Sequence, residues 1–300
     1  MKLATFDDDR VGLVVGDEVL DLTDVVRGLA PATGSTHATS TMRRLIERWS
    51  DVRPLLDDPS GLPRHRLADV ALGAPVPDPS KVVAAPVNYV DHMDEMNQAG
   101  HVSSLGIFLK APSSVVGPDS VVRLPYDDRR FDHEGELALV VGRTARHVAE
   151  DEAESYVFGY TGLLDMTMRG GEDRSTRKSF DTFTPMGPWL VTPDEVGSSS
   201  AVDLRLTVDG VQRQHAGTGD LIWGVAKLIA YASSVMTLHP GDVLTTGTPA
   251  GVGPVSDGSR VRLELSGIGV LEVSVSDAGA TPCPTLGAGK GPVPPPPPAA

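Results

Sequence analysis

Short runs of strand-forming residues, separated by glycine and proline, dominate this chain and limit what it can fold into. The clearest is the run 136–141, in which Glu136 is followed by five consecutive apolar residues, as in strands that are covered on both faces. Helical spacing is rare, and its longest example is 222–238. Many strands, few helices and turn-rich connections predict a β-rich α+β fold. The other predicted strands are 3–6, 11–15, 18–22, 82–85, 160–166, 188–191, 203–208, 242–246, 260–265 and 270–275.

Composition divides the chain into three parts. Residues 1–77 combine short strands with a helical pattern at 41–50 and a polar, proline-rich connector at 55–74, which predicts a small N-terminal α/β domain. Residues 78–280 carry most of the strands and predict a larger domain. Residues 281–300 include five consecutive prolines, a composition that favours polyproline II or disorder, so we predict a disordered tail.

Charge and composition exclude several classes of function. The formal net charge is −14 and no basic stripe is visible, so we expect no nucleic-acid or membrane partner. A single cysteine, Cys283, rules out an intrachain disulfide and a zinc site built on several cysteines. The acidic start of the chain does not resemble a secretory signal, which predicts a cytoplasmic protein. An anionic substrate would be repelled at long range, so it would need a local cluster of cations or a metal ion.

Three carboxylates form the first candidate constellation. Glu134 and Glu136 are two residues apart at the start of a predicted strand, so their side chains point to the same face. Asp165 lies in an apolar run, where an isolated charge is costly unless it is paired or bound to a metal. The alternatives are a solvated strand end for the glutamates and a buried salt bridge from Asp165 to Arg169. Together the three acids suit magnesium or manganese.

Two further segments carry residues suited to proton transfer and charge stabilisation. His92 and Glu95 share one face if their segment is helical, and a carboxylate beside an imidazole makes a general base that can activate water. Lys178, close to aromatic residues, is a candidate oxyanion stabiliser. A surface His–Glu pair and an ordinary exposed lysine are the alternatives. The Gly- and Thr-rich loop 245–253 could hold an anion or be a plain turn, and it lacks the lysine of a P-loop.

Four stretches resemble the fumarylacetoacetate hydrolase family in their residues and in their order along the chain. They are 88–95, 134–136, 178–191 and 240–253, and the resemblance extends from about Lys81 to Val275. It implies a mixed β-sandwich or β-roll catalytic domain, a homodimer, and one Mg²⁺ or Mn²⁺ ion, which Ca²⁺ could replace in a crystal.

The resemblance also implies roles for individual residues. The residues that match the metal ligands are Glu134, Glu136 and Asp165. Those that match the family's catalytic groups are His92 and Glu95, which activate water, and Lys178, which lies near the developing negative charge. The residues expected to contact the substrate or line its entrance are Arg169, Thr248, Gly247, Lys110 and Phe108.

Two departures from the family pattern stand out. Where members often have Arg-Asp-x-Gln after the aspartate ligand, this chain has Arg169-Gly170-Gly171-Glu172. Glu172 would place a negative charge near the pocket, so the identity of the substrate is left open. Pro86-Val87 replaces the usual glycine before Asn88-Tyr89. Neither change removes an expected ligand or a member of the His–Glu pair.

The activity that the resemblance implies is hydrolytic C–C cleavage of an acylpyruvate-type (2,4-dioxo acid) substrate. The ion would act as template and Lewis acid, while His92 activates water and Lys178 stabilises the oxyanion. An isomerase of the 5-carboxymethyl-2-hydroxymuconate type and a 2-oxo acid decarboxylase are alternatives at the same site. A non-catalytic, metal-dependent 2-oxo acid binding protein is the alternative of another class, but such a protein has no need of a general base.

Overall fold

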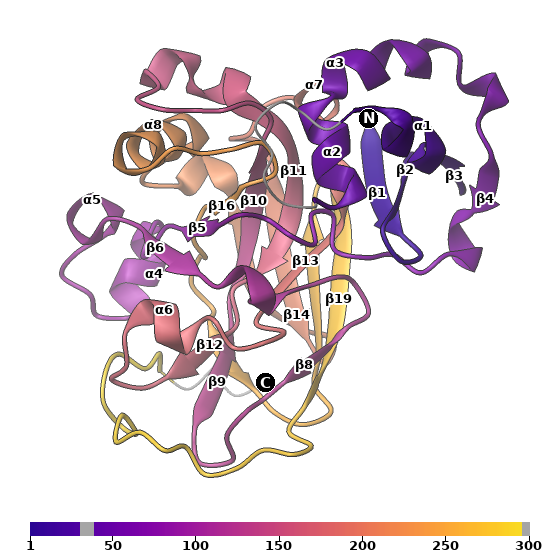
Figure 1. Cartoon of the computed structure of the whole chain (residues 1–300). Coiled ribbons are helices and arrows are strands. Elements are labelled where there is room, and N and C mark those ends of the chain that lie inside the picture. Colours follow the sequence, from indigo (N-terminus) through magenta and orange to yellow (C-terminus); the bar gives the residue numbers. More distant parts are fainter. Residues whose placement is uncertain (31–38, 296–300) are drawn as a thin grey trace.

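Two β-sheets stacked face to face form the centre of the molecule, and a third, smaller sheet lies at one end (Figure 1). The computed structural model describes residues 1–30 and 39–295. The large sheet has the strand order β4-β3-β2-β1-β13-β11-β10-β16-β5-β6, and β7 pairs with β13. In that order its strands are Arg64–Arg66, Glu18–Asp21, Arg10–Val15, Lys2–Phe6, Thr184–Val191, Val157–Leu164, Gly135–Val141, Val243–Thr245, Val82–Ala84 and Phe108–Lys110, with β7 at Val115–Val116.

The two smaller sheets complete the β-structure. The five-stranded sheet has the order β15-β14-β18-β19-β8, with strands Val211–Gly217, Asp203–Val208, Arg260–Leu265, Gly269–Ser276 and Val121–Arg123. The three-stranded sheet has the order β12-β9-β17, with strands Thr167–Arg169, Arg130–His133 and Gly253–Val255. Parallel and antiparallel pairs both occur, and the predicted β-rich α+β fold is confirmed.

Helices are short and lie around the sheets (Figure 1). The α-helices are α1 Thr23–Gly28, α2 Thr41–Glu47, α3 Trp49–Val52, α4 Val90–Glu95, α5 Val102–Leu105, α6 Arg174–Arg177, α7 Pro193–Val196 and α8 Val225–Val235. The 3₁₀ turns are η1 Arg53–Asp57, η2 Pro59–Gly61, η3 Leu67–Asp69, η4 Pro112–Ser114, η5 Glu150–Tyr156 and η6 Thr218–Asp220. Within the described residues, none of these helices combines the length and apolar character needed to cross a bilayer.

Strand β10 explains the uninterrupted apolar run of the sequence, because each of its faces packs against a different core. Leu137, Leu139 and Val141 belong to the core shared with β14 and β18 of the five-stranded sheet. Ala138 and Val140 belong to the core shared with helix α2 and the N-terminal strands. In strand β18 of the five-stranded sheet, buried and exposed residues alternate, because only one face of this strand packs on the large sheet.

The N-terminal residues continue the large sheet. Strand β1 pairs antiparallel with β13, with Leu3 opposite Leu190, so β1 to β4 extend the sheet that contains β10. Backbone hydrogen bonds and a shared core connect these strands to the rest of the sheet, and the small N-terminal domain expected for residues 1–77 stays a prediction. Figure 1 shows β1 to β4 in indigo and purple at one edge of the molecule.

Two predicted segments differ from the structure for local reasons. The helix expected at 222–238 is the shorter α8, because Asn88 binds the preceding residues: its backbone oxygen accepts from the backbone N–H of Ile222 at 2.8 Å, and its side-chain oxygen from that of Trp223 at 2.8 Å. The connector expected at 55–74 contains strand β4 and several 3₁₀ turns. There β4 pairs with β3, with Val19 opposite His65.

A buried aspartate holds β16 against its parallel neighbour β5. The side chain of Asp242 is fully buried and accepts hydrogen bonds from the backbone N–H groups of His239 at 2.7 Å and Lys81 at 3.2 Å. It also accepts from the Ser80 hydroxyl and from the Lys81 ammonium. Because a buried carboxylate is costly unless its oxygens are bonded, these contacts hold the turn before β16 in one conformation.

We therefore expect Asp242→Ala to lower the free energy of unfolding by about 2–4 kcal/mol, since it leaves buried donors without an acceptor. Urea denaturation measures the change. Asp220→Ala, at an exposed position, is the control. An equal effect in the two variants would contradict the structural role of Asp242.

Candidate active site

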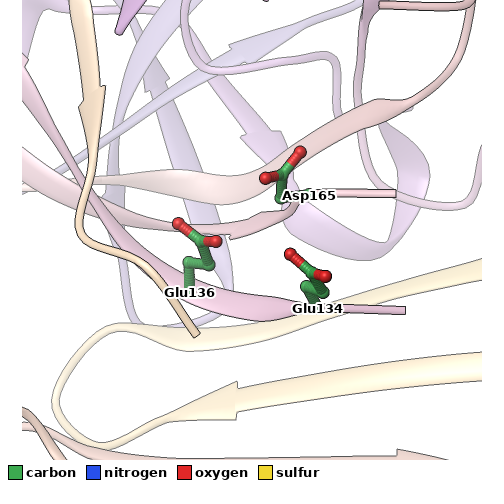
Figure 2. Close-up of side chains that lie close together, drawn as sticks. All are labelled: Glu134, Glu136 and Asp165. Carbon is green, nitrogen blue, oxygen red and sulfur yellow. The ribbon is translucent and has the colours of Figure 1, made fainter. Parts of the chain in front are cut away.

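Three buried carboxylates lie close together where β10 begins and β11 ends (Figure 2). Glu134 immediately precedes β10, Glu136 lies on it, and Asp165 directly follows β11. One oxygen from each carboxylate lies within 4.8 Å of the other two. The backbone N–H of Asp165 donates to the carbonyl oxygen of Glu134 at 2.8 Å, which aligns the two strand ends. The structure thus brings together the three acids that the sequence singles out.

The glycine between the two glutamates is required by close packing. A side chain at Gly135 would place its first carbon 2.8 Å from Leu206 and 3.0 Å from Leu263, both in the five-stranded sheet. The backbone N–H of Gly135 also donates to the side-chain oxygen of Gln214 at 2.9 Å. The sandwich core therefore fixes the strand end from which both glutamates project.

Two lysines neutralise part of the carboxylate charge. The ammonium of Lys178 donates to Glu134 at 2.7 Å, to Asp165 at 2.5 Å and to the hydroxyl of Thr167 at 2.7 Å. Lys110, which is almost fully buried, pairs with the other oxygen of Asp165. Glu134 and Asp165 therefore each have a cationic partner.

Glu136 has a different environment. Its carboxylate accepts hydrogen bonds from the hydroxyl of Thr245 and from the backbone N–H of Gly247, the latter at 2.8 Å, and no described lysine, arginine or histidine forms an ion pair with it. Burial raises the pKa of Glu136, and the negative charge of Asp165 raises it further. Positive charge is thus missing on this side of the three acids.

Glu134 shows the opposite balance. Burial by itself would raise the pKa of Glu134, but the charges of Lys178 and Arg169 outweigh burial and lower it.

The three carboxylates fit a hard divalent cation on the side of Glu136. The ligand atoms are oxygens, they converge, and Glu136 has no cationic partner among the described residues. Glu134, Glu136 and Asp165 would hold such an ion.

A histidine–glutamate pair faces the same pocket. His92 and Glu95 lie on α4, and the Nδ1 atom of His92 is 3.1 Å from one Glu95 oxygen. The second Glu95 oxygen accepts from the backbone N–H of Gly251 at 2.9 Å. Only glycine fits at that position, because its φ is +97° and a first side-chain carbon would lie 1.9 Å from the carbonyl oxygen of Arg213. With Nδ1 bound to Glu95, Nε2 is the nitrogen left to take a proton.

The start of α4 is tied to the loop after β16. The side-chain nitrogen of Asn88 donates to the carbonyl oxygens of Thr246 at 2.8 Å and Trp223 at 2.9 Å. This contact brings the histidine–glutamate pair and the Gly- and Thr-rich loop to one pocket, whose lining includes His92, Lys178 and the three carboxylates.

Comparison with known proteins decides the family. Residues 81–276 match the family model for the fumarylacetoacetate (FAA) hydrolase C-terminal domain. The chain belongs to the fumarylacetoacetate hydrolase family. Maleylpyruvate hydrolase of Aquipseudomonas alcaligenes is 43% identical over 289 residues, which cover 91% of this chain and 99% of that protein. The predictions of the family and of an enzyme are confirmed.

Solved structures agree with the family assignment. Maleylpyruvate hydrolase from Sphingobium sp. SYK-6, crystallised with manganese(II) and pyruvate, has 42% identity and a TM-score of 0.81, covering 92% of this chain and 99% of that one. A 5-carboxymethyl-2-hydroxymuconate delta-isomerase from Mycobacterium smegmatis has 32% identity and a TM-score of 0.71, covering 92% of this chain and 100% of that one. Family members with different reactions therefore share this fold.

The residues expected to contact substrate in this family separate into two groups. Phe108, Arg169 and Thr248 line the pocket. In the structure Lys110 binds Asp165 and Gly247 binds Glu136. These contacts support the carboxylates, and neither residue is among those that line the described pocket. Their contact with substrate stays a prediction.

The salt bridge from Asp165 to Arg169, which the sequence left as an alternative, does not form. The guanidinium of Arg169 instead donates to Asp132 at 2.5 Å and to Glu134 at 2.8 Å, and Asp165 pairs with Lys110 and Lys178. The reason is geometric: Arg169 lies on β12, which is antiparallel to β9, so the arginine reaches the acids at the end of β9.

The segment after residue 280 lies against the catalytic domain as far as Pro295 (yellow in Figure 1). The disordered tail predicted for 281–300 stays a prediction; the structure describes residues 281–295, and 296–300 lie outside the described residues. The backbone N–H of Cys283 donates to Asp128 at 2.9 Å, and that of Gly171 to the carbonyl oxygen of Gly287 at 3.0 Å. Pro292 reaches the pocket and lines it.

Glu172 binds this tail. Its carboxylate accepts a hydrogen bond from the Thr285 hydroxyl, which lowers the pKa of Glu172. The sequence departure Gly170-Gly171-Glu172 therefore provides a contact for the tail, and Glu172 is not among the residues that line the described pocket.

The pocket wall also contains two arginines and a proline that were not predicted from the sequence, Arg174, Arg177 and Pro292. A signal for the arginines was available, because Arg174, Arg177 and Lys178 form a cationic cluster in a chain of net charge −14. Nothing in the sequence indicates that Pro292 approaches the pocket.

We expect Gly291→Ala to loosen the tail more than Gly289→Ala. Both glycines have a positive φ, but a side chain at Gly291 would lie 2.4 Å from the carbonyl oxygen of Gly170, whereas Gly289 has open space. Hydrogen–deuterium exchange of residues 281–295 should rise at least about tenfold more in the first variant. Equal exchange in both variants would show that the tail does not depend on this contact.

Proposed function

We propose that this chain is a metal-dependent hydrolase that splits a C–C bond of an acylpyruvate, with maleylpyruvate as the first substrate to test. The observation that supports it most directly is the pocket lined by His92, Lys178 and the three carboxylates, with Glu95 bound to Nδ1 of His92. The 43% identity to maleylpyruvate hydrolase supports this reaction class. A non-catalytic binding protein would not need this set of groups.

The metal ion that we propose is Mg²⁺ or Mn²⁺, held by Glu134, Glu136 and Asp165. When bound, it would supply Lewis-acid polarisation of the 2-oxo and carboxylate oxygens of the substrate. We also propose that the enzyme acts as a homodimer in the cytoplasm, as its family resemblance and sequence predict.

His92 is proposed to activate the water. Glu95 holds Nδ1 of the imidazole, so Nε2 can take a proton as the water oxygen attacks the acyl carbonyl carbon. Glu95 itself is oriented by the backbone N–H of Gly251. The pair is thereby kept in one tautomer and one orientation.

Lys178 is proposed to stabilise negative charge as it develops. Its ammonium lies between Glu134 and Asp165 and 5.6 Å from the ring centre of Phe108 at the pocket wall. The bond between C3 and the acyl carbon then breaks, and its electron pair goes to the pyruvate fragment. The proton taken by His92 can return to C3, which gives pyruvate and a carboxylic acid.

An isomerase is the second candidate, because a 5-carboxymethyl-2-hydroxymuconate delta-isomerase shares the fold at 32% identity. Mass-resolved turnover of maleylpyruvate and a hydroxymuconate, using metal-stripped protein with and without Mn²⁺, separates the two reactions. The proposal predicts Mn²⁺-dependent formation of pyruvate and maleate. A product with the mass of its substrate would favour the isomerase.

We expect His92→Gln and Lys178→Met each to lower kcat by roughly 100-fold or more, because each removes a group that acts in the transition state. His215→Gln, at an exposed histidine paired with Asp203, should keep normal turnover. Steady-state pyruvate release measures all three. Near-normal rates in the first two variants would refute the assigned roles.

A further inference from the structure

One buried arginine of the pocket has no anionic partner. Arg177 is the last residue of α6 and is only 6% exposed. Its Nε and Nη1 atoms are buried and have no hydrogen-bond acceptor among the described residues. A guanidinium stays protonated in proteins, so its N–H groups always need acceptors, and leaving them unbonded in the interior costs free energy.

The other buried lysine and arginine side chains of the described chain are all paired with carboxylates. Lys110 contacts Asp165, Arg169 contacts Asp132 and Glu134, and Lys178 contacts Glu134 and Asp165. Arg177 forms no such ion pair within residues 1–30 and 39–295, the described part of the chain. Burial lowers the pKa of Arg177 and the charge of Arg169 lowers it further, and together they outweigh the opposing effect of the more distant Glu134 and Asp165.

The position of Arg177 points to the substrate as the source of that anion. Arg177 lines the pocket that also contains the three carboxylates and His92. Arg174 and Pro292 line the pocket too, so its wall holds a second cation and an apolar ring. An acylpyruvate whose 2-oxo acid end lies at the carboxylates would extend its acyl chain toward the rest of this wall.

We propose that Arg177 binds a second carboxylate of the substrate, so that the pocket selects dicarboxylic acylpyruvates over monocarboxylic ones. This inference rests on the proposed function, and it assigns the end of the substrate that the carboxylate site leaves undefined. Arginine suits the task because its planar N–H groups can bind a carboxylate through two parallel hydrogen bonds. A local cation also offsets the repulsion of an anion by a chain of net charge −14.

The test compares Arg177→Met with the wild-type enzyme on maleylpyruvate, a diacid, and acetylpyruvate, a monoacid. We expect kcat/KM for maleylpyruvate to fall about 100-fold or more, because a charged hydrogen-bonded pair is lost, while that for acetylpyruvate stays within about threefold. Arg177→Lys should restore part of the preference for the diacid. Arg205→Met, on the exposed side of β14, is the control and should change neither value.

Equal losses on the two substrates would overturn the inference, because they would mean that Arg177 only supports the fold or the neighbouring Lys178. Wild-type kcat/KM values for both substrates in Arg177→Met would overturn it as well. If the wild-type enzyme cleaves neither substrate, the proposed hydrolysis fails, and maleate binding to the Mn²⁺-loaded protein then tests Arg177 separately by calorimetry. Weaker maleate binding in Arg177→Met than in Arg205→Met would support the inference, and equal binding would overturn it.

Discussion

Three carboxylates packed within 4.8 Å of one another in a buried site are the constraint on which the rest of this structure depends. Like charges so close repel strongly in a medium of low polarity, so each acid needs compensating positive charge or must take up a proton. Lys178, Lys110 and Arg169 compensate Glu134 and Asp165. Glu136 has only hydrogen bonds, and a divalent cation there would complete the balance of charge.

The fold holds these groups in place from several directions. The sandwich core fixes the end of β10 through the close packing at Gly135. The turn before β16, anchored by Asp242, positions the loop whose backbone N–H binds Glu136. Asn88 then ties that loop to the helix that carries His92. Each anchor comes from a different part of the chain, and Asn88, Gly135 and Asp242 all lie within the range that matches the family model.

The sequence was sufficient to predict the β-rich fold, the family and the three carboxylates, His92 and Lys178 that the structure brings to the pocket. The three acids, His92, Glu95 and Lys178 could be predicted because short-range spacing and sequence motifs mark them. The partner of Arg169, the supporting positions of Lys110 and Gly247, and the contact of Glu172 with the tail depend on pairing between distant segments. Thr285 is 113 residues from Glu172, and no local pattern marks such an approach. Arg177 was missed because an unpaired guanidinium is visible only when every neighbour is known.

We propose that the three carboxylates are the ligands of one divalent cation. A crystal structure of the protein soaked with Mn²⁺ and pyruvate, with anomalous scattering recorded for manganese, tests it most directly. We expect one strong manganese peak bound by oxygens of Glu134, Glu136 and Asp165, with pyruvate beside it. Density that shows Lys178 still bridging Glu134 and Asp165, with no manganese peak at these residues, would contradict it.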